Sequence, residues 1–116
     1  MRFFIPIIAL VLMTACAGAT NAPKIDGAPE VVVTTGAMSY SPTSIAFVAG
    51  AANLTLRNES DSDHDITIPD LGVHLIARSH ETVTAGLHDL KPGRYEGYCS
   101  MLGHAEAGMR ISVTVR

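Results

Sequence analysis

The chain has 116 residues, of which 47% are hydrophobic and 16% charged, and its formal net charge is −3 at pH 7. This length accommodates one domain with its own core, and an acidic balance without a basic run excludes the electrostatic footprint of a nucleic-acid-binding protein. Trp is absent and aromatic residues make up 5%, while Val, Ile and Thr recur, which favours strands over long helices.

The first fifteen residues have the pattern of an export signal. Arg2 is the only charged residue among them, and the apolar run that follows it is too short to span a bilayer. The run ends in Leu-Met-Thr-Ala-Cys at 12–16, which resembles the lipobox of bacterial lipoproteins. We therefore expect a lipoprotein-type signal peptide over residues 1–15 and lipidation of Cys16; ordinary secretory cleavage at the small residues 17–19 is the alternative.

Residues 16–29 contain two prolines and two glycines without periodicity, which predicts a flexible tether. The domain then covers residues 30–116, and the membrane is contacted through the lipid anchor only. We expect a monomer that is exported to the periplasm or another extracytoplasmic compartment. With Cys16 lipidated, Cys99 has no disulfide partner, so it is either a buried spectator or a working thiolate.

Short β-rich runs recur between turn signals from residue 30 onward. In the last of them Ile111, Val113 and Val115 alternate with polar residues, the pattern of a strand with one buried face. The runs cover 30–35, 44–48, 52–58, 64–68, 81–87, 94–99 and 109–116. Their spacing predicts an all-β fold, a Greek-key β-sandwich or barrel of seven or eight strands.

The segment 98–109 carries the candidate metal chemistry. It places a thiol, an imidazole and a thioether at Cys99, His104 and Met109, with four residues in each gap, so that a single loop can wrap one metal ion. His64 opens the run 64–68 with the parity of its inward-pointing isoleucines and offers a second imidazole. Because rigidity matters as much as ligand identity, we expect the histidine and the loop to be held from two different sheets.

Two histidines, one cysteine and a more distant methionine are the ligand set of a blue-copper electron-transfer centre. Met109 argues against zinc, for which a thioether is a poor ligand. The sequence contains no His-x-His pair for a trinuclear oxidase site, and the mature chain is too short for the second copper site of a nitrite reductase. With four protein ligands the ion has no open position for a substrate, so we expect no enzymatic activity.

Several segments resemble the cupredoxins, in particular small bacterial type 1 blue copper proteins with the ligand-loop spacing of auracyanin and rusticyanin. They are Asn58 with His64 six residues later, 68–72, the turn 91–95, and 98–109. The resemblance implies a Greek-key sandwich and one type 1 copper ion, with His64, Cys99, His104 and Met109 as ligands.

The sequence departs from the cupredoxin pattern at two positions. Asp65 replaces an asparagine that helps to tie the ligand loops together, which predicts a weaker or solvated link. Leu102 stands where proline often precedes Gly-His. Neither change removes a ligand, and both bear on the reduction potential.

These features predict a one-electron carrier between redox partners such as a cytochrome and an oxidase. An apolar patch of Met101, Leu102, Ala105 and Ala107 surrounds His104, where a partner can dock. The flanking acidic residues either steer a basic partner or form a solvated loop; they are Glu59, Asp61, Asp63, Asp65 and Asp70.

Two other functions remain open at this point. One is copper capture or delivery at the cell envelope, and the other is a metal-free adhesion or scaffolding module. His74, His80 and His88 compete with His64 as the second imidazole, although none of them opens a predicted strand. Solvated surface positions are the simpler interpretation of all three.

Overall fold

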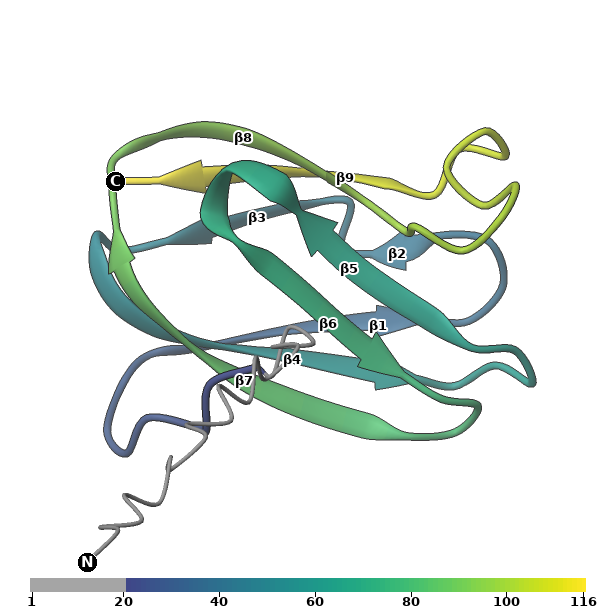
Figure 1. Cartoon of the computed structure of the whole chain (residues 1–116), viewed down its shortest axis with the longest axis horizontal. Coiled ribbons are helices and arrows are strands. Elements are labelled where there is room, and N and C mark those ends of the chain that lie inside the picture. Colours follow the sequence, from purple (N-terminus) through teal and green to yellow (C-terminus); the bar gives the residue numbers. More distant parts are fainter. Residues whose placement is uncertain (1–20) are drawn as a thin grey trace, which may run out of the picture.

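A computed structural model describes residues 21–116 of the chain (Figure 1). The predicted signal peptide and the predicted lipidation site, Cys16, lie outside these described residues. Within 21–116, no helix has the length and apolar character needed to cross a membrane.

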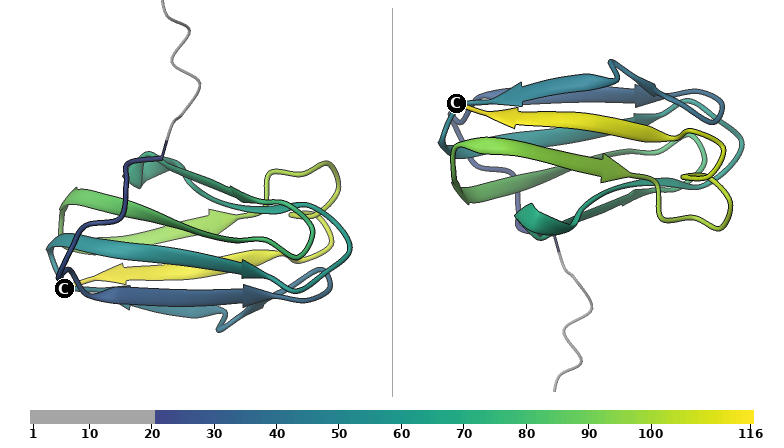
Figure 2. Two further views of the ribbon diagram at one scale, coloured as in Figure 1. Left: turned by 90° about the horizontal axis from the view of Figure 1, so that it is seen from below. Right: turned by 90° about the horizontal axis from the view of Figure 1, so that it is seen from above.

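The domain is a sandwich of two β-sheets that lie face to face (Figure 2). The four-stranded sheet has the order β2 (Tyr40–Ser41), β1 (Glu30–Thr35), β4 (Gly50–Asn58) and β7 (Thr82–Leu90). The five-stranded sheet has the order β3 (Ser44–Phe47), β9 (Arg110–Val115), β8 (Gly93–Tyr98), β5 (His64–Ile68) and β6 (Val73–Ala77). The pairs β1–β4 and β3–β9 are parallel and the other pairs are antiparallel. The predicted all-β sandwich is confirmed.

Nine strands form within residues 21–116, compared with the seven or eight expected. The two-residue β2 is too short to leave a period-two signal in the sequence. β6 follows the 3-10 turn η1 (Pro69–Leu71) and buries Val73, Leu75 and Ala77 while its intervening residues are more exposed. Its alternation was therefore present in the sequence, although it is not among the predicted runs.

The core fills the space between the sheets with aliphatic side chains. Leu54 and Leu56 of β4 and Ile66 and Ile68 of β5 belong to one buried cluster. Gly97 of β8 lies at a close approach, because a Cβ atom there would come within 2.8 Å of the Ile111 side chain. Dense packing of this kind holds the strand ends that carry the loops in fixed positions.

Residues 22–29 lie against the four-stranded sheet instead of extending as a free spacer. The side chain of Asn53 accepts from the Ile25 amide and donates to the carbonyls of Ile25 and Ala28, at 2.8–3.3 Å. The amide of Gly86 donates to the Ala22 carbonyl at 2.9 Å. The part of the predicted tether after residue 21 is therefore pinned to the domain, and a flexible spacer stays a prediction only for the residues before it.

Four loops gather at one end of the sandwich, on the right in Figure 1. They are the β1–β2 loop, the β4–β5 loop, the β6–β7 loop and the long β8–β9 loop over residues 99–109. The candidate ligands lie at this end.

Candidate metal centre

Three of the predicted ligands converge at this end of the molecule. The donor atoms of His64, Cys99 and His104 all lie within 4.8 Å of one another, the one such group of metal-binding side chains within residues 21–116. His64 is the first residue of β5, Cys99 follows β8 directly, and His104 lies in the middle of the β8–β9 loop. His64 and Cys99 are buried and His104 is half-buried, so one imidazole edge faces the surface.

The two donor separations that involve His104 suit a single first-row metal ion. The Nδ1 atoms of His64 and His104 are 3.2 Å apart, and the Sγ atom of Cys99 is 3.5 Å from Nδ1 of His104. For bond lengths of about 2.0 Å to nitrogen and about 2.3 Å to sulfur, these separations correspond to angles at the ion of about 105° and about 110°. The two imidazole rings have centroids 5.0 Å apart and are tilted by 53° to each other.

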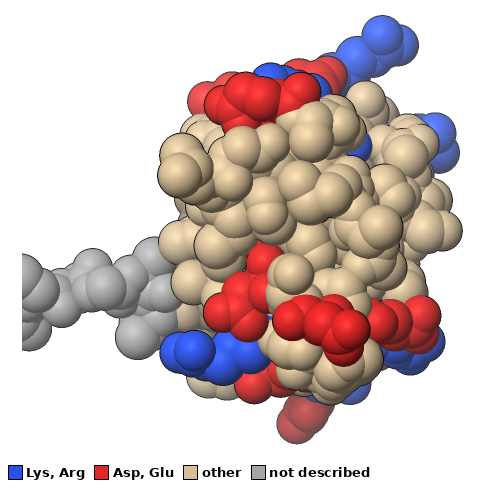
Figure 3. Space-filling view, turned by 90° about the vertical axis from the view of Figure 1, so that its right-hand side faces the viewer, with Lys and Arg blue, Asp and Glu red and all other residues tan. Residues whose placement is uncertain are grey.

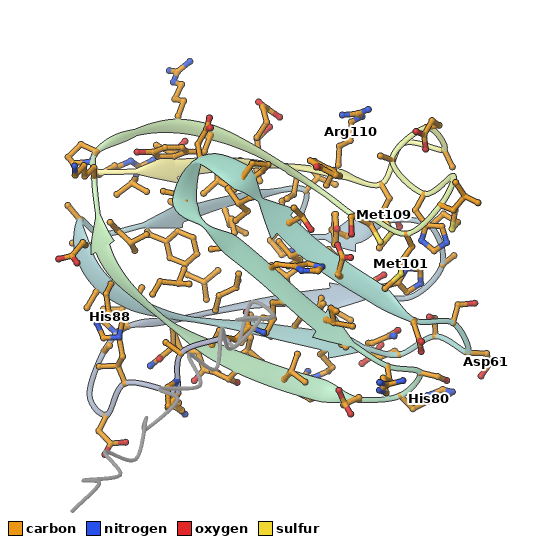
Figure 4. The ribbon with its side chains drawn as sticks, in the orientation of Figure 1. Asp61, His80, His88, Met101, Met109 and Arg110 are labelled. Carbon is orange, nitrogen blue, oxygen red and sulfur yellow. The ribbon has the colours of Figure 1, made fainter. Side chains whose placement is uncertain are left out.

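Met109 is held beside these three donors by the backbone. Its carbonyl accepts from the Cys99 amide at 3.1 Å, and its own amide donates to the His104 carbonyl at 3.1 Å. Its side chain is fully buried and lies at the loop end of the molecule (Figure 4). The backbone contacts therefore tie the three predicted ligands of the loop into one unit.

Turns that need glycine shape the loop. Gly103 and Gly108 have φ values of 83° and 99°, a region that residues with a Cβ atom adopt rarely. The chain between them makes helix-like turns, in which Ala107 donates to the carbonyls of Gly103 and His104. Short reversals of this kind return the chain to β9 and place His104 over Cys99.

Burial sets the protonation of the metal-free site. Burial raises the pKa of the Cys99 thiol, although hydrogen bonds from the backbone of Asp65 and Met101 oppose the rise. Burial, and then the neighbouring charge of His104, lower the pKa of His64. The metal-free site thus favours a neutral thiol and a neutral His64 imidazole, and a bound cation would displace the thiol proton. Nε2 of His64 is buried without a hydrogen-bond partner.

The residues present fit one type 1 copper ion, the cofactor that the sequence predicts. Two imidazole nitrogens, one thiolate and a nearby thioether form a mixed soft and borderline donor set. Zinc prefers four cysteine, histidine or carboxylate donors, and within residues 21–116 no carboxylate belongs to the cluster.

All the strands that present these residues belong to the five-stranded sheet, so the expectation of two sheets was wrong. β5, β8 and β9 lie side by side, and their ends bring the histidine and both ends of the loop together. The four-stranded sheet contributes support. Asn58 of β4 donates to the carbonyls of Ser62, Ala77 and Arg78 at 2.7–3.1 Å, which fixes the chain entering β5.

Two residues near the site differ from the sequence analysis. Tyr40 of β2 was not predicted to take part, yet its buried hydroxyl donates to the backbone carbonyl of Asp65. The alternative of a solvated link at Asp65 was wrong, because its side chain is buried and accepts hydrogen bonds from Ser100. A buried tyrosine in a two-residue strand leaves no recognisable sequence signal.

The other histidines lie outside the donor cluster. His80 is exposed and contacts Asp61 at 2.7 Å (Figure 4), and His88 lies at the opposite end of the sandwich. His74 of β6 approaches the Asp65 carboxylate at 3.4 Å. The choice of His64 over these three agrees with the geometry.

The surface over the site is uncharged at its centre. Figure 3 shows a broad area without Lys, Arg, Asp or Glu side chains, with acidic groups along two of its sides. Leu102 projects from the β8–β9 loop with its side chain fully exposed. Two of the five acidic residues predicted to flank His64 do not belong to this surface. Asp65 is buried, and Asp70 lies in η1, beyond the far end of β5.

Comparisons with known proteins point to one family. A family model for a cupredoxin-like domain matches residues 6–111. No curated protein matches the sequence. Among solved structures, auracyanin B has 20% identity and a TM-score of 0.67, over 84% of this chain and 95% of that one. Auracyanin from Roseiflexus castenholzii has 17% identity and a TM-score of 0.66, over 78% and 99%.

A third similar structure is a domain of a transport ATPase. The metal-binding domain of the Streptococcus pneumoniae Cu(I)-exporting P-type ATPase CopA has 20% identity and a TM-score of 0.64, over 82% of this chain and 92% of that one. At these identities the solved structures establish a shared fold. Since the family model covers nearly the whole described domain, and the sandwich carries its candidate ligands at the loop end, the chain belongs to the cupredoxin-like domain family.

Proposed function

We propose that this protein is an exported one-electron carrier that holds one type 1 copper ion. His64, Cys99 and His104 would hold the ion through Nδ1, Sγ and Nδ1, and the thioether of Met109 would be a fourth, weaker ligand. The observation that carries the proposal is the convergence of three donors within 4.8 Å of one another, with Nδ1 of His104 3.2 Å from Nδ1 of His64 and 3.5 Å from Sγ of Cys99. Bound copper supplies a centre that gains and loses one electron without leaving the protein.

A rigid site is what electron transfer requires of the protein. Backbone hydrogen bonds between Cys99, His104 and Met109 hold the three ligands of the β8–β9 loop together. The amide of Asp65, the residue after His64, donates to Sγ of Cys99 at 3.4 Å and joins the loop to β5. The positions of the ligands can then stay nearly constant when the charge of the ion changes. Small movements of the ligands keep the reorganisation energy of electron transfer small. With four protein ligands no position remains for a substrate, which favours a carrier over an enzyme.

Electrons would enter and leave through the half-buried ring of His104. The uncharged surface beside it, with Leu102 at its exposed tip, suits brief contact with a redox protein such as a cytochrome or an oxidase. Exposed Glu59, Asp61 and Asp63 on the adjoining β4–β5 loop would favour a partner with basic residues around its own contact surface.

Copper capture and delivery is the second candidate. Met101 and Met109 both lie at the loop end (Figure 4), and thioethers suit Cu(I). The name of the similar ATPase domain specifies Cu(I), but this likeness bears only on the fold. A carrier and a delivery protein differ in how readily the metal leaves.

Redox cycling in the presence of a Cu(I) chelator tests the proposal. The copper-loaded protein is reduced and reoxidised repeatedly, and bound copper is measured after each cycle. We expect one electron per protein and retention of the metal; rapid loss of Cu(I) to the chelator without reoxidation would favour delivery. Replacement of Cys16 by serine tests the anchor, because a lipoprotein so altered leaves the membrane fraction or stalls in processing.

A further inference from the structure

Asp65 has a buried carboxylate side chain between His64 and the Cys99 segment. It follows His64 directly in β5, and its side chain has no solvent-exposed surface. A buried charge is costly unless donors surround it. Its partners therefore indicate what the residue does.

Donors from three segments meet the two oxygens of this carboxylate. Oδ1 accepts from the Ser100 amide at 2.8 Å and from the Thr67 hydroxyl at 3.0 Å. Oδ2 accepts from the Ser100 hydroxyl and lies 3.4 Å from Nε2 of His74. Thr67 belongs to β5, His74 to β6, and Ser100 follows Cys99 in the ligand loop, so the side chain joins both strands to the segment that carries the thiolate.

The backbone of the same residue completes the connection. The Asp65 amide donates to Sγ of Cys99 at 3.4 Å, and its carbonyl accepts from the buried Tyr40 hydroxyl. Asp65 thus touches the Cys99 sulfur through its amide and the residue after Cys99 through its side chain. Hydrogen bonds of this kind around a metal ligand orient it and tune the metal.

Within residues 21–116, no lysine or arginine forms an ion pair with this carboxylate, and His74 is its one ion-pair partner. The neutral hydroxyl and amide donors disperse the negative charge without cancelling it. An asparagine could accept the Ser100 amide in the same way without carrying a charge. The carboxylate therefore adds a fixed charge to a link that a neutral side chain could also make.

We propose that the negative charge of Asp65, at the position that ties the Cys99 segment to β5, lowers the reduction potential of the bound copper. This inference rests on the proposed copper site. The oxidised ion carries one more positive charge than the reduced ion, so a nearby buried negative charge stabilises the oxidised form. One electron is gained on reduction, and the four ligands remain bound.

The test compares Asp65→Asn with Thr67→Val in the copper-loaded chain. Asp65→Asn removes the charge and keeps an acceptor for the Ser100 amide, whereas Thr67→Val removes one donor and keeps the charge. In Asp65→Asn, the equilibrium constant for reduction of the copper by a mediator of fixed potential should rise about tenfold. This rise corresponds to an increase of about 59 mV in the midpoint potential for a one-electron couple. Thr67→Val should not raise it.

The midpoint potential is measured together with the visible spectrum and with urea unfolding of the metal-free variants. An unchanged or lower potential in Asp65→Asn, with the copper band intact, would overturn the inference. If Asp65→Asn does not fold, the inference is tested with Ser100→Ala. This variant keeps the Asp65 carboxylate but removes the hydroxyl that donates to it, so the midpoint potential should fall. A rise in the midpoint potential of Ser100→Ala would overturn the inference. Absence of the band from the parent chain would instead refute the copper site itself.

Discussion

Substitution of Gly97 by alanine tests whether close packing beside Cys99 holds the metal site. A Cβ atom at this position would lie 2.8 Å from Cγ2 of Ile111, 3.1 Å from Cγ1 of Ile68 and 3.3 Å from the Thr67 carbonyl oxygen. Gly97 is buried in β8 between β5 and β9, so the added methyl group must push one of these strands aside. Overpacking of a well-packed core costs about 1–3 kcal/mol.

A loss of this size is measurable by thermal or urea unfolding of the metal-free protein. For a domain of this size it corresponds to a fall in Tm of about 4–8 °C per kcal/mol. Since Cys99 follows two residues later, the copper-loaded variant should also show a shifted or weakened thiolate band.

Gly36→Ala is the matched control. Gly36 lies in the exposed β1–β2 loop, and a Cβ atom there would meet no heavy atom within 4 Å. Its substitution should leave both the unfolding transition and the spectrum nearly unchanged. Equal stability of the Gly97→Ala and Gly36→Ala variants would refute the argument that tight packing of β8 positions the thiolate.

Three further predictions concern the ligands and the surface. Met109→Leu should retain copper and colour but raise the midpoint potential, because a weak axial donor mainly tunes the redox equilibrium; loss of the metal would contradict the axial role. Leu102→Asp should leave the visible spectrum unchanged and slow electron self-exchange, since a charge on this fully exposed tip opposes close approach; equal rates at matched ionic strength would mean that electrons leave through another face. The metal-free chain should lose stability as the pH falls below about 6.5, because the unfolded chain then takes up a proton that His64, with its lowered pKa, excludes in the folded state; a urea midpoint that is constant between about pH 7.5 and about pH 5.5 would contradict this sign.

The strands with one buried face could be predicted from the sequence. In β9 the buried residues Ile111, Val113 and Val115 alternate with more exposed ones, which is the local signal of such a strand. The prediction that one loop brings Cys99 and His104 together agrees with the structure. It could be made from the sequence because the loop is a local feature whose turns depend on its own glycines.

Features that depend on contacts between distant segments could not be predicted in this way. The burial of Asp65 requires donors from β6 and from the ligand loop, and nothing in its neighbouring sequence indicates them. The docking of residues 22–29 depends on the side chain of Asn53, in a strand far along the chain. The placement of all the ligand-bearing strand ends in one sheet follows from the strand order, which alternation alone does not determine.

The visible absorption spectrum of the copper-loaded protein tests the central claim most directly. With one Cu(II) ion per chain bound by the Cys99 thiolate, the account predicts an intense thiolate-to-copper charge-transfer band and a blue or green colour. The band should disappear on reduction with one electron and should be absent from Cys99→Ala. A colourless complex that contains one Cu(II) ion per chain would contradict the type 1 site.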